Sequence, residues 1–283
     1  MSVAAEALDP AVVRLVATDL DGTIVRRDGT ISERTVRALA AVEDSGRRLV
    51  LVTGRPVRWM GPVVEATGHR GVAICANGAV VYDLHAEKLR EWFPLVPDVT
   101  REAVARLRAV LPGAGFAVEY PDGFGHDPDY HPRWDVGEPI VAPIEDLIGQ
   151  PVTKLLVRHE TLPSDEMLAR ARAALADLAE PTHSSNDGLL EVCAPGVSKA
   201  TTLARLAGEW GIAAHEVVAF GDMPNDVPML LWAGWGFAMA GAHPEALTAA
   251  PHVTGSVEDD GVAQVVESLL APADPDDSAP DRR

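Results

Sequence analysis

Basic residues are scarce in this sequence of 283 residues. It has 24 lysines and arginines against 42 aspartates and glutamates, which gives a formal net charge of -18. A surface of this sign repels the phosphates of nucleic acids and of anionic lipids, so we expect neither nucleic acid nor a membrane surface as a partner. No segment approaches the ~20 apolar residues of a membrane-spanning helix, and residues 1–13 lack the pattern of a secretory signal.

Cysteine and aromatic residues are also few. Cys75 and Cys193 are too few for a disulfide framework, and both lie in apolar segments that suit small buried side chains. A reducing compartment fits this usage, and we expect a cytoplasmic protein. Hydrophobic residues make up 47% of the chain, which is enough for one large domain or two modest ones. Residues 272–283, rich in Pro and Asp, are predicted to be a disordered tail.

Short segments rich in β-branched residues alternate with longer helical patterns. This alternation is typical of an α/β fold with a doubly wound parallel sheet. The expected strands are 14–20, 47–53, 72–76, 217–222 and 236–240. The expected helices are 32–46, which begins at an N-cap Ser32, 56–68, with Pro56 in its first turn, and 198–211.

The segment 84–194 differs from the rest of the chain. It contains most of the loop-forming sequence, around helical patterns at 98–111 and 164–179 and strands at 152–159 and 188–193. We predict that it is an α+β cap domain inserted into a discontinuous core of residues 1–83 and 195–271. The alternative is one α/β domain with long loops, but a 20-residue loop such as 120–139 is unusual inside one compact unit.

Polar residues follow the expected core strands where each strand ends. Ligands of open parallel sheets bind beyond these carboxyl ends. The residues concerned are Asp19, Asp21, Thr53, Gly54, Arg55, Asn77, Gly78, Asp222, Asn225 and Asp226, with Lys199 at the start of a helix. Burying carboxylates and an ammonium together is costly unless a divalent cation and an anion complete the set. Oxygen ligands of this kind favour Mg²⁺.

Four of these segments resemble, in order and context, the motifs of the haloacid dehalogenase (HAD) superfamily. They are DLDGT at 19–23, VTGR at 52–55, GVSKA at 196–200 and GDMPNDVPML at 221–230. CANGA at 75–79, the insertion, and EDDGVAQVVESLL at 258–270 are similar to the Cof-type phosphatases, and the resemblance covers about residues 13–271. It implies a Rossmann-like core with a cap and a Mg²⁺-dependent phosphatase. The expected substrates are small phosphorylated metabolites, sugar phosphates first and phosphates of pyridoxal or flavin next.

The resemblance also implies roles for single residues. Asp19 is the expected nucleophile, which forms an aspartyl phosphate. Asp21 is the expected acid for the leaving oxygen and then the base for the attacking water. The residues expected around the phosphoryl group are Thr53, Gly54, Asn77, Lys199 and Asn225. The expected Mg²⁺ ligands are the Asp19 carboxylate, the Asp21 carbonyl oxygen and Asp222, with Asn225 and Asp226 ligating or orienting waters.

Several residues leave alternatives open. Arg133 and Trp134 either contact the leaving group, where an aromatic face suits a sugar or a ring, or Trp134 packs in the core of the cap. Arg55 is either a phosphate-side residue or an ion-pair partner. His126 and His131, beside Asp127 and Asp129, are interpreted as solvated loop residues rather than as a second metal site.

The motifs do not separate a phosphatase from a phosphomutase, which returns the phosphoryl group to a sugar. A regulatory phosphoacceptor also uses a strand-end Asp, a hydroxyl and a Lys. Asp21 and the insertion argue against it, because an acid/base beside the nucleophile shortens the life of a phosphoaspartate. Complete motifs argue against a catalytically silent binding protein. A monomer and a homodimer fit the sequence equally.

Overall fold

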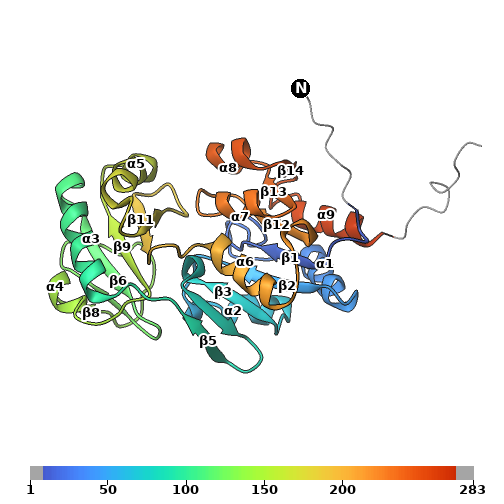
Figure 1. The fold of residues 1–283 in the computed structure, drawn as a ribbon, viewed down its shortest axis with the longest axis horizontal. Coiled ribbons are helices and arrows are strands. Elements are labelled where there is room, and N and C mark those ends of the chain that lie inside the picture. Colours follow the sequence, from blue (N-terminus) through green and yellow to red (C-terminus); the bar gives the residue numbers. More distant parts are fainter. Residues whose placement is uncertain (1–8, 272–283) are drawn as a thin grey trace, which may run out of the picture.

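The computed structural model describes residues 9–271, and the expected tail at 272–283 lies outside this range. Two β-sheets, each with its own hydrophobic core, form two regions that lie side by side in Figure 1. We call the region with the larger sheet the core and the other region the cap. None of the helices within residues 9–271 is long and apolar enough to cross a membrane.

The core sheet has eight strands. They are β1 (Leu15–Thr18), β2 (Arg48–Val52), β3 (Val72–Cys75), β4 (Val80–Asp83), β5 (Lys88–Trp92), β12 (Val217–Gly221), β13 (Trp235–Met239) and β14 (His252–Thr254). Their order is β14-β13-β12-β1-β2-β3-β4-β5. The pairs from β14 to β3 are parallel and the last two pairs are antiparallel. All five strands expected for the core are present.

The core helices form two packed groups, in agreement with the expected doubly wound fold. One group is α1 (Glu33–Asp44), α2 (Gly61–Thr67) and α9 (Gly261–Leu270), and the other is α6 (Lys199–Glu209), α7 (Val227–Trp232) and α8 (Pro244–Ala249). Strand β1, at the centre of the sheet, is completely buried, as a strand covered on both faces should be. Ser32 caps α1 by accepting a hydrogen bond from the Thr35 amide, as predicted.

The expected helix at 56–68 is wrong in its first half. The chain forms a short 3₁₀ turn at Val57–Trp59, and α2 begins only at Gly61. Pro62 explains the difference, because proline has no amide hydrogen and is tolerated in the first turn of a helix but not in its interior. The helix therefore starts just before Pro62 instead of running through it.

The cap has a six-stranded sheet and three helices. Its strands are β6 (Gly115–Glu119), β7 (Phe124–His126), β8 (Ile140–Val141), β9 (Lys154–Arg158), β10 (Glu180–Thr182) and β11 (Leu189–Cys193), in the order β10-β11-β9-β6-β7-β8. Its helices are α3 (Pro97–Val110), α4 (Ile144–Leu147) and α5 (Ser164–Leu175), and α3 packs against α5. The expected helices and strands of this segment are present.

The start of the cap lies later in the chain than the expected residue 84. Strand β5 pairs with β4, so the core sheet extends to Trp92, and the first cap helix begins at Pro97. The β4–β5 hairpin carries few apolar residues in its second strand, KLREW, and no sequence pattern marks it as part of the core. The expected loop at 120–139 also contains a strand, β7.

The two faces of the cap sheet differ in chemistry. Side chains in β6, β9 and β11 alternate, so that one face packs with α3 and α5 in an apolar core that includes Phe116, Val118, Leu155, Val157, Leu190 and Val192. The residues between them on these strands include four charged ones, Glu119, Lys154, Arg158 and Glu191, all of them buried. The charged face is the one that meets the core.

A second contact joins cap and core near α8. Asp165 of α5 accepts hydrogen bonds from His183 Nε2 of the cap at 2.9 Å and from His243 Nε2 of the core at 3.2 Å. His243 Nδ1 accepts the Glu245 amide hydrogen at 3.2 Å, so the neutral ring carries its proton on Nε2. With this tautomer the cluster is a hydrogen-bonded contact between the two regions.

Candidate active site

Asp19 follows directly after β1, at the carboxyl end of the central strand. Its side chain is almost fully buried, and its Oδ1 accepts a hydrogen bond from Lys199 Nζ at 2.5 Å. Lys199 begins α6 and also donates to Asp226 Oδ1 at 2.7 Å. Burial raises the pKa of Asp19 to about 7, although Lys199 acts in the opposite direction. The first and third expected motifs therefore meet at one buried ion pair.

Three carboxylates gather around this point. Asp19, Asp222 and Asp226 place carboxylate oxygens within 4.8 Å of one another. Burial and the neighbouring charges of Asp19 and Asp226 raise the pKa of Asp222 to about 9. One ammonium, that of Lys199, does not balance three carboxylates, and a divalent cation would neutralise the excess charge. The donor set fits such a cation.

Asp226 has a different part in this cluster from the other two carboxylates. Its Oδ2 accepts the amide hydrogens of Asp222 and Met223, each at 3.0 Å, while its Oδ1 is held by Lys199. The turn after β12 is thereby fixed by a buried side chain. Asp19 and Asp222 retain more free lone pairs for a cation than Asp226 does.

Gly22 lets the loop after β1 approach Asp222. Its φ is +82°, and a Cβ atom at this position would lie 2.2 Å from Asp222 Oδ2. Any side chain here would displace the carboxylate, in addition to the strain of the left-handed backbone. The glycine of the DLDGT segment is therefore required for the acidic cluster to form.

The remaining rim residues lie in the loops that follow β2, β3 and β12, at the same end of the sheet as Asp19. Thr53 is buried, and its Oγ1 accepts the Arg55 amide hydrogen at 3.0 Å. Asn225 Nδ2 donates to Asn77 Oδ1 at 2.9 Å, which connects the fourth motif to the CANGA segment. A Cβ atom at Gly54 would lie 3.1 Å from Asn77 Oδ1, so this loop also packs closely.

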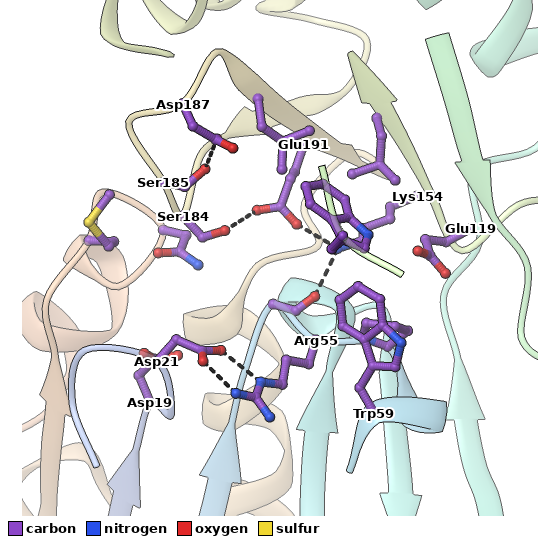
Figure 2. A pocket seen from close by; sticks show the side chains of 17 residues that line it. Asp19, Asp21, Arg55, Trp59, Glu119, Lys154, Ser184, Ser185, Asp187 and Glu191 are labelled. Atoms are coloured by element: carbon purple, nitrogen blue, oxygen red, sulfur yellow. Dashed lines mark hydrogen bonds and ion pairs between the residues drawn. The ribbon is translucent and has the colours of Figure 1, made fainter. Parts of the chain in front are cut away.

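Asp21 forms a two-point ion pair with Arg55, visible in Figure 2. Arg55 Nε donates to Asp21 Oδ2 at 2.8 Å, and Arg55 Nη2 donates to Oδ1 at 2.5 Å. The Asp21 side chain is 58% exposed, in contrast to the buried Asp19. Of the two roles left open for Arg55, the structure contains the ion pair.

A cavity of about 280 Å³ lies between core and cap, with Asp19 and Asp21 on its core side. The charged face of the cap sheet forms its other wall, through Glu119, Lys154 and Glu191. Lys154 Nζ donates to Glu191 Oε1 at 2.5 Å and to the Gly54 carbonyl oxygen at 2.8 Å. A buried cap lysine thus contacts the loop that carries Thr53.

The two expected specificity residues of the cap separate in the structure. Trp134 lines the cavity, and its ring meets that of Trp59 edge to face, with centroids 6.2 Å apart. Arg133 does not line the cavity. It is exposed, donates to the Asp187 carbonyl oxygen at 2.9 Å and pairs with Glu160 at 3.2 Å.

Sequence reasoning missed most of the cap wall of the cavity and three residues on its core side, Pro56, Trp59 and Met223. The missed cap residues are Glu119, Lys154, Leu156, Ser184, Ser185, Asp187, Leu189 and Glu191. A usable signal exists in the strands: Glu119, Lys154 and Glu191 are charged residues in otherwise apolar strand segments. The loop residues Ser184, Ser185 and Asp187 carry no comparable signal.

A family model for haloacid dehalogenase-like hydrolases matches residues 16–266. The chain belongs to this family. The match confirms the family that the four motifs indicate, and with the named relatives it confirms the expected class of enzyme, a phosphoric monoester hydrolase.

Individual members of the family are similar over nearly the whole chain. The 5-amino-6-(5-phospho-D-ribitylamino)uracil phosphatase YitU of Bacillus subtilis is 27% identical, over 91% of this chain and 97% of that protein. A phosphoglycolate phosphatase of Methanoculleus marisnigri is 29% identical, over 90% and 96%. The structure of the HAD subclass IIB sugar phosphatase BT4131 has a TM-score of 0.78 at 20% identity, over 91% and 99% of the two chains. The last similarity supports the fold.

Proposed function

We propose that this haloacid dehalogenase-like phosphatase hydrolyses small phosphorylated metabolites through an aspartyl phosphate on Asp19, with Mg²⁺ as its cation. The observation that carries the proposal is the position of Asp19, buried against Lys199 at the end of β1 and facing a cavity that the cap closes. A phosphate ester in this cavity would meet the nucleophile with its phosphorus and the cap with its leaving group.

In the first step, a carboxylate oxygen of Asp19 attacks phosphorus and the bond to the leaving oxygen breaks. Lys199 and the Thr53 hydroxyl stabilise the charge on the phosphoryl oxygens. Asp21 gives a proton to the leaving oxygen. Both oxygens of Asp21 are engaged by Arg55, so at least one of these hydrogen bonds must be exchanged for the leaving group.

In the second step, Asp21 accepts a proton from water, and the water oxygen attacks the phosphorus of the aspartyl phosphate. Inorganic phosphate leaves and the Asp19 carboxylate is restored. Arg55 holds the Asp21 carboxylate in position for this step, because its guanidinium binds both carboxylate oxygens. The same pair of residues thereby serves both halves of the cycle.

Asp19, Asp222 and the Asp21 carbonyl oxygen would hold Mg²⁺, with Asn225 and Asp226 beside them. When bound, the ion neutralises negative charge on the transferring phosphoryl group. The proposal is supported by the charge excess of the cluster and by the raised pKa of Asp222, which burial and its acidic neighbours cause. Carboxylate and carbonyl oxygens are the ligands that Mg²⁺ prefers.

The substrate class is proposed at the level of small phosphorylated metabolites. The relatives are named for a ribitylamino-uracil phosphate, for phosphoglycolate and for sugar phosphates. The motif resemblance places sugar phosphates first and ring-bearing cofactor phosphates next. A cytoplasmic location and a monomeric or homodimeric state stay predictions.

Replacement of each aspartate separately tests the mechanism. Asp19→Asn removes the nucleophilic charge and should form no phosphoenzyme with any substrate. Asp21→Asn keeps the nucleophile but loses the base, typically a ~10²–10⁴-fold contribution, so with p-nitrophenyl phosphate the aspartyl phosphate should accumulate. Acid-quenched mass spectrometry of the protein measures the added phosphoryl group. An adduct on the Asp19→Asn protein would place the nucleophile elsewhere.

Product analysis separates the remaining functions. A phosphatase releases inorganic phosphate in step with the alcohol, whereas a phosphomutase returns the phosphoryl group to a sugar. A phosphoacceptor would release neither at a useful rate. The position of Asp21 on the cavity, next to the nucleophile, favours hydrolysis over a long-lived phosphoaspartate.

A further inference from the structure

We infer that inorganic phosphate, the second product, leaves the active site through a second cavity, which begins at Lys199 and Asn225 and opens at the surface between core and cap. The inference rests on the proposed function, because only hydrolysis at Asp19 makes this phosphate. We call the cavity that receives the substrate the first cavity. Three observations carry the inference: the course of the second cavity, the charges that line it and the amide pair at its inner end.

The second cavity has a volume of about 210 Å³ and is lined by residues of both core and cap. Exposed cap residues, among them Arg172 of α5 and Glu180 of β10, line its outer part. Asn77 and Lys199, each 1% exposed, line its inner part. Asn225 lines both cavities. The second cavity therefore leads from the surface to the buried ion pair of the active site.

The two cavities differ in the charges of their walls. Among the described residues, five acidic and two basic side chains line the first cavity, and one acidic and two basic side chains line the second. Arg58 and Arg158, which pair with Glu119 and Asp187 of the first wall, do not line that cavity, so an anion there meets carboxylates first. A phosphate ester passes this wall because its leaving group gains contacts there, whereas free phosphate does not. The second cavity is the more favourable route for a free anion.

Each end of the second cavity carries a cation. At the outer end, Arg172 Nη2 lies 3.2 Å from Glu245 Oε1, and both side chains are exposed, so this ion pair is weak and Arg172 can turn to an anion. At the inner end, Lys199 is the first residue of α6, whose N-terminal amide hydrogens also favour negative charge. A phosphate ion that leaves Lys199 therefore moves toward a second positive charge.

A pair of buried amide side chains lies at the inner end of the second cavity. Asn225 Nδ2 donates to Asn77 Oδ1 at 2.9 Å. The two other polar atoms of the pair, Asn77 Nδ2 and Asn225 Oδ1, are buried and have no hydrogen-bond partner within residues 9–271. At neutral pH inorganic phosphate has oxygens that accept hydrogen bonds and a hydroxyl that donates one, so it can serve both atoms. Separation of the pair breaks a single hydrogen bond, which contacts with the departing phosphate replace.

Substitutions that fill the second cavity test the inference. Thr182 of β10 and Ala176, which follows α5, line the second cavity but not the first. Thr182→Trp and Ala176→Trp should therefore block the route without contact to the substrate. The matched controls are Thr182→Val, which keeps the size of the side chain, and Ala173→Trp, which places the same ring at an exposed position of α5 outside both cavities.

The measurement compares the phosphate that has formed with the phosphate that has left the enzyme. During turnover of p-nitrophenyl phosphate, acid quenching counts all inorganic phosphate that has formed, whereas a fluorescent phosphate-binding protein counts only free phosphate. The difference is the phosphate that is still bound to the enzyme. Inhibition of the steady-state rate by added phosphate gives the equilibrium affinity for the same ion.

In the filled variants we expect the rate of phosphate release to fall about tenfold or more, with bound phosphate accumulating during turnover, because product release then limits kcat. The inhibition constant for phosphate should stay within about twofold of the wild type, because a blocked route slows entry and exit alike. Both controls should behave as the wild type does.

An unchanged release rate in Thr182→Trp, or in Ala176→Trp if the first variant fails to fold, would overturn the inference. An inhibition constant that changes as much as the release rate would also contradict it, because the ring would then have distorted the active site. Absence of turnover by the wild type with Mg²⁺ would overturn the proposed function instead.

Discussion

The core and the cap both bury charged side chains at the cavity, but they balance them differently. In the core, Lys199 faces three carboxylates, and burial raises the pKa of both Asp19 and Asp222. In the cap, the buried charges on the face of the sheet that meets the core have opposite partners, as in the pairs Lys154–Glu191 and Arg158–Asp187. The excess negative charge of the core thus suits a bound cation and the reaction at phosphorus. The paired charges of the cap suit the selection of a substrate.

This difference predicts two kinds of mutational effect. A change in the acidic cluster of the core should lower the rate for every substrate by a similar factor, because it acts on the phosphoryl group that all substrates share. A change in the cap should alter the ranking of substrates or the stability of the cap.

Removal of the divalent cation should have the largest effect. Excess chelator should lower kcat for all substrates at least about a hundredfold, because the acidic cluster then lacks its counter-charge. Mg²⁺ should restore the rate, and Ca²⁺ should suppress it, because Ca²⁺ takes more ligands in looser geometry and can engage both oxygens of Asp19. Initial rates in metal-buffered solution measure the effect. Undiminished turnover in chelator would contradict the cation assignment.

Lys154→Met should have the next largest effect, and mainly on the cap. The change leaves Glu191 buried without its partner, which costs about 3–5 kcal/mol when a buried pair is broken from one side. Chemical denaturation followed by fluorescence measures the loss. The double variant Lys154→Met with Glu191→Leu should recover much of it, because an apolar pair replaces the ionic one. No recovery would show that the lysine acts mainly through its hydrogen bond to Gly54.

Acid should weaken the cap through His183, by a smaller amount. Burial lowers the pKa of His183 below its ordinary value of 6.5, although Asp165 raises it. The unfolded chain then binds a proton more readily than the folded one, so stability falls as the pH drops below about 6.5. His183→Gln should flatten this part of the stability curve, measured as unfolding temperature against pH. His131→Gln, which replaces an exposed cap histidine, is the control.

Arg133→Ala should have the smallest effect. Arg133 lies outside the cavity and is exposed, so the ranking of substrates should stay as in the wild type and the free energy of unfolding should change by no more than about 0.5 kcal/mol. Values of kcat/KM for p-nitrophenyl phosphate and for a set of sugar and cofactor phosphates measure the ranking. A clear change in ranking would mean that the cap offers a different face to bound substrates.

The sequence predicts the site residues of the core well because they lie next to the core strands along the chain. Asp19, Thr53 and Asp222 each follow a strand within one or two residues, and parallel strands bring their carboxyl ends to one edge. The order of the motifs therefore translates directly into a site. The same argument places Lys199, since Ser198 caps its helix and fixes where α6 begins.

For the cap, the sequence predicts the helices and strands but not the residues that face the cavity. Helices α3 and α5 follow from apolar periodicity, but the face that meets the core depends on how the cap docks. Glu119 and Lys154 lie opposite each other on adjacent antiparallel strands, a pairing that no local pattern specifies. The split of the helix at 56–68 has a local cause in Pro62, which the sequence already contained. The hairpin at β5 depends on pairing with β4 across a turn.

The glycine in the DLDGT loop limits what the site tolerates. Gly22 and Gly29 have nearly the same backbone, with φ of +82° and +84°, but a Cβ at Gly29 would meet nothing within 4 Å. Alanine or asparagine at position 29 would cost only the left-handed backbone, roughly 1 kcal/mol. Alanine at position 22 would also collide with Asp222. In a library of all single variants scored for activity, position 29 should therefore accept several residues, whereas position 22 should accept glycine alone.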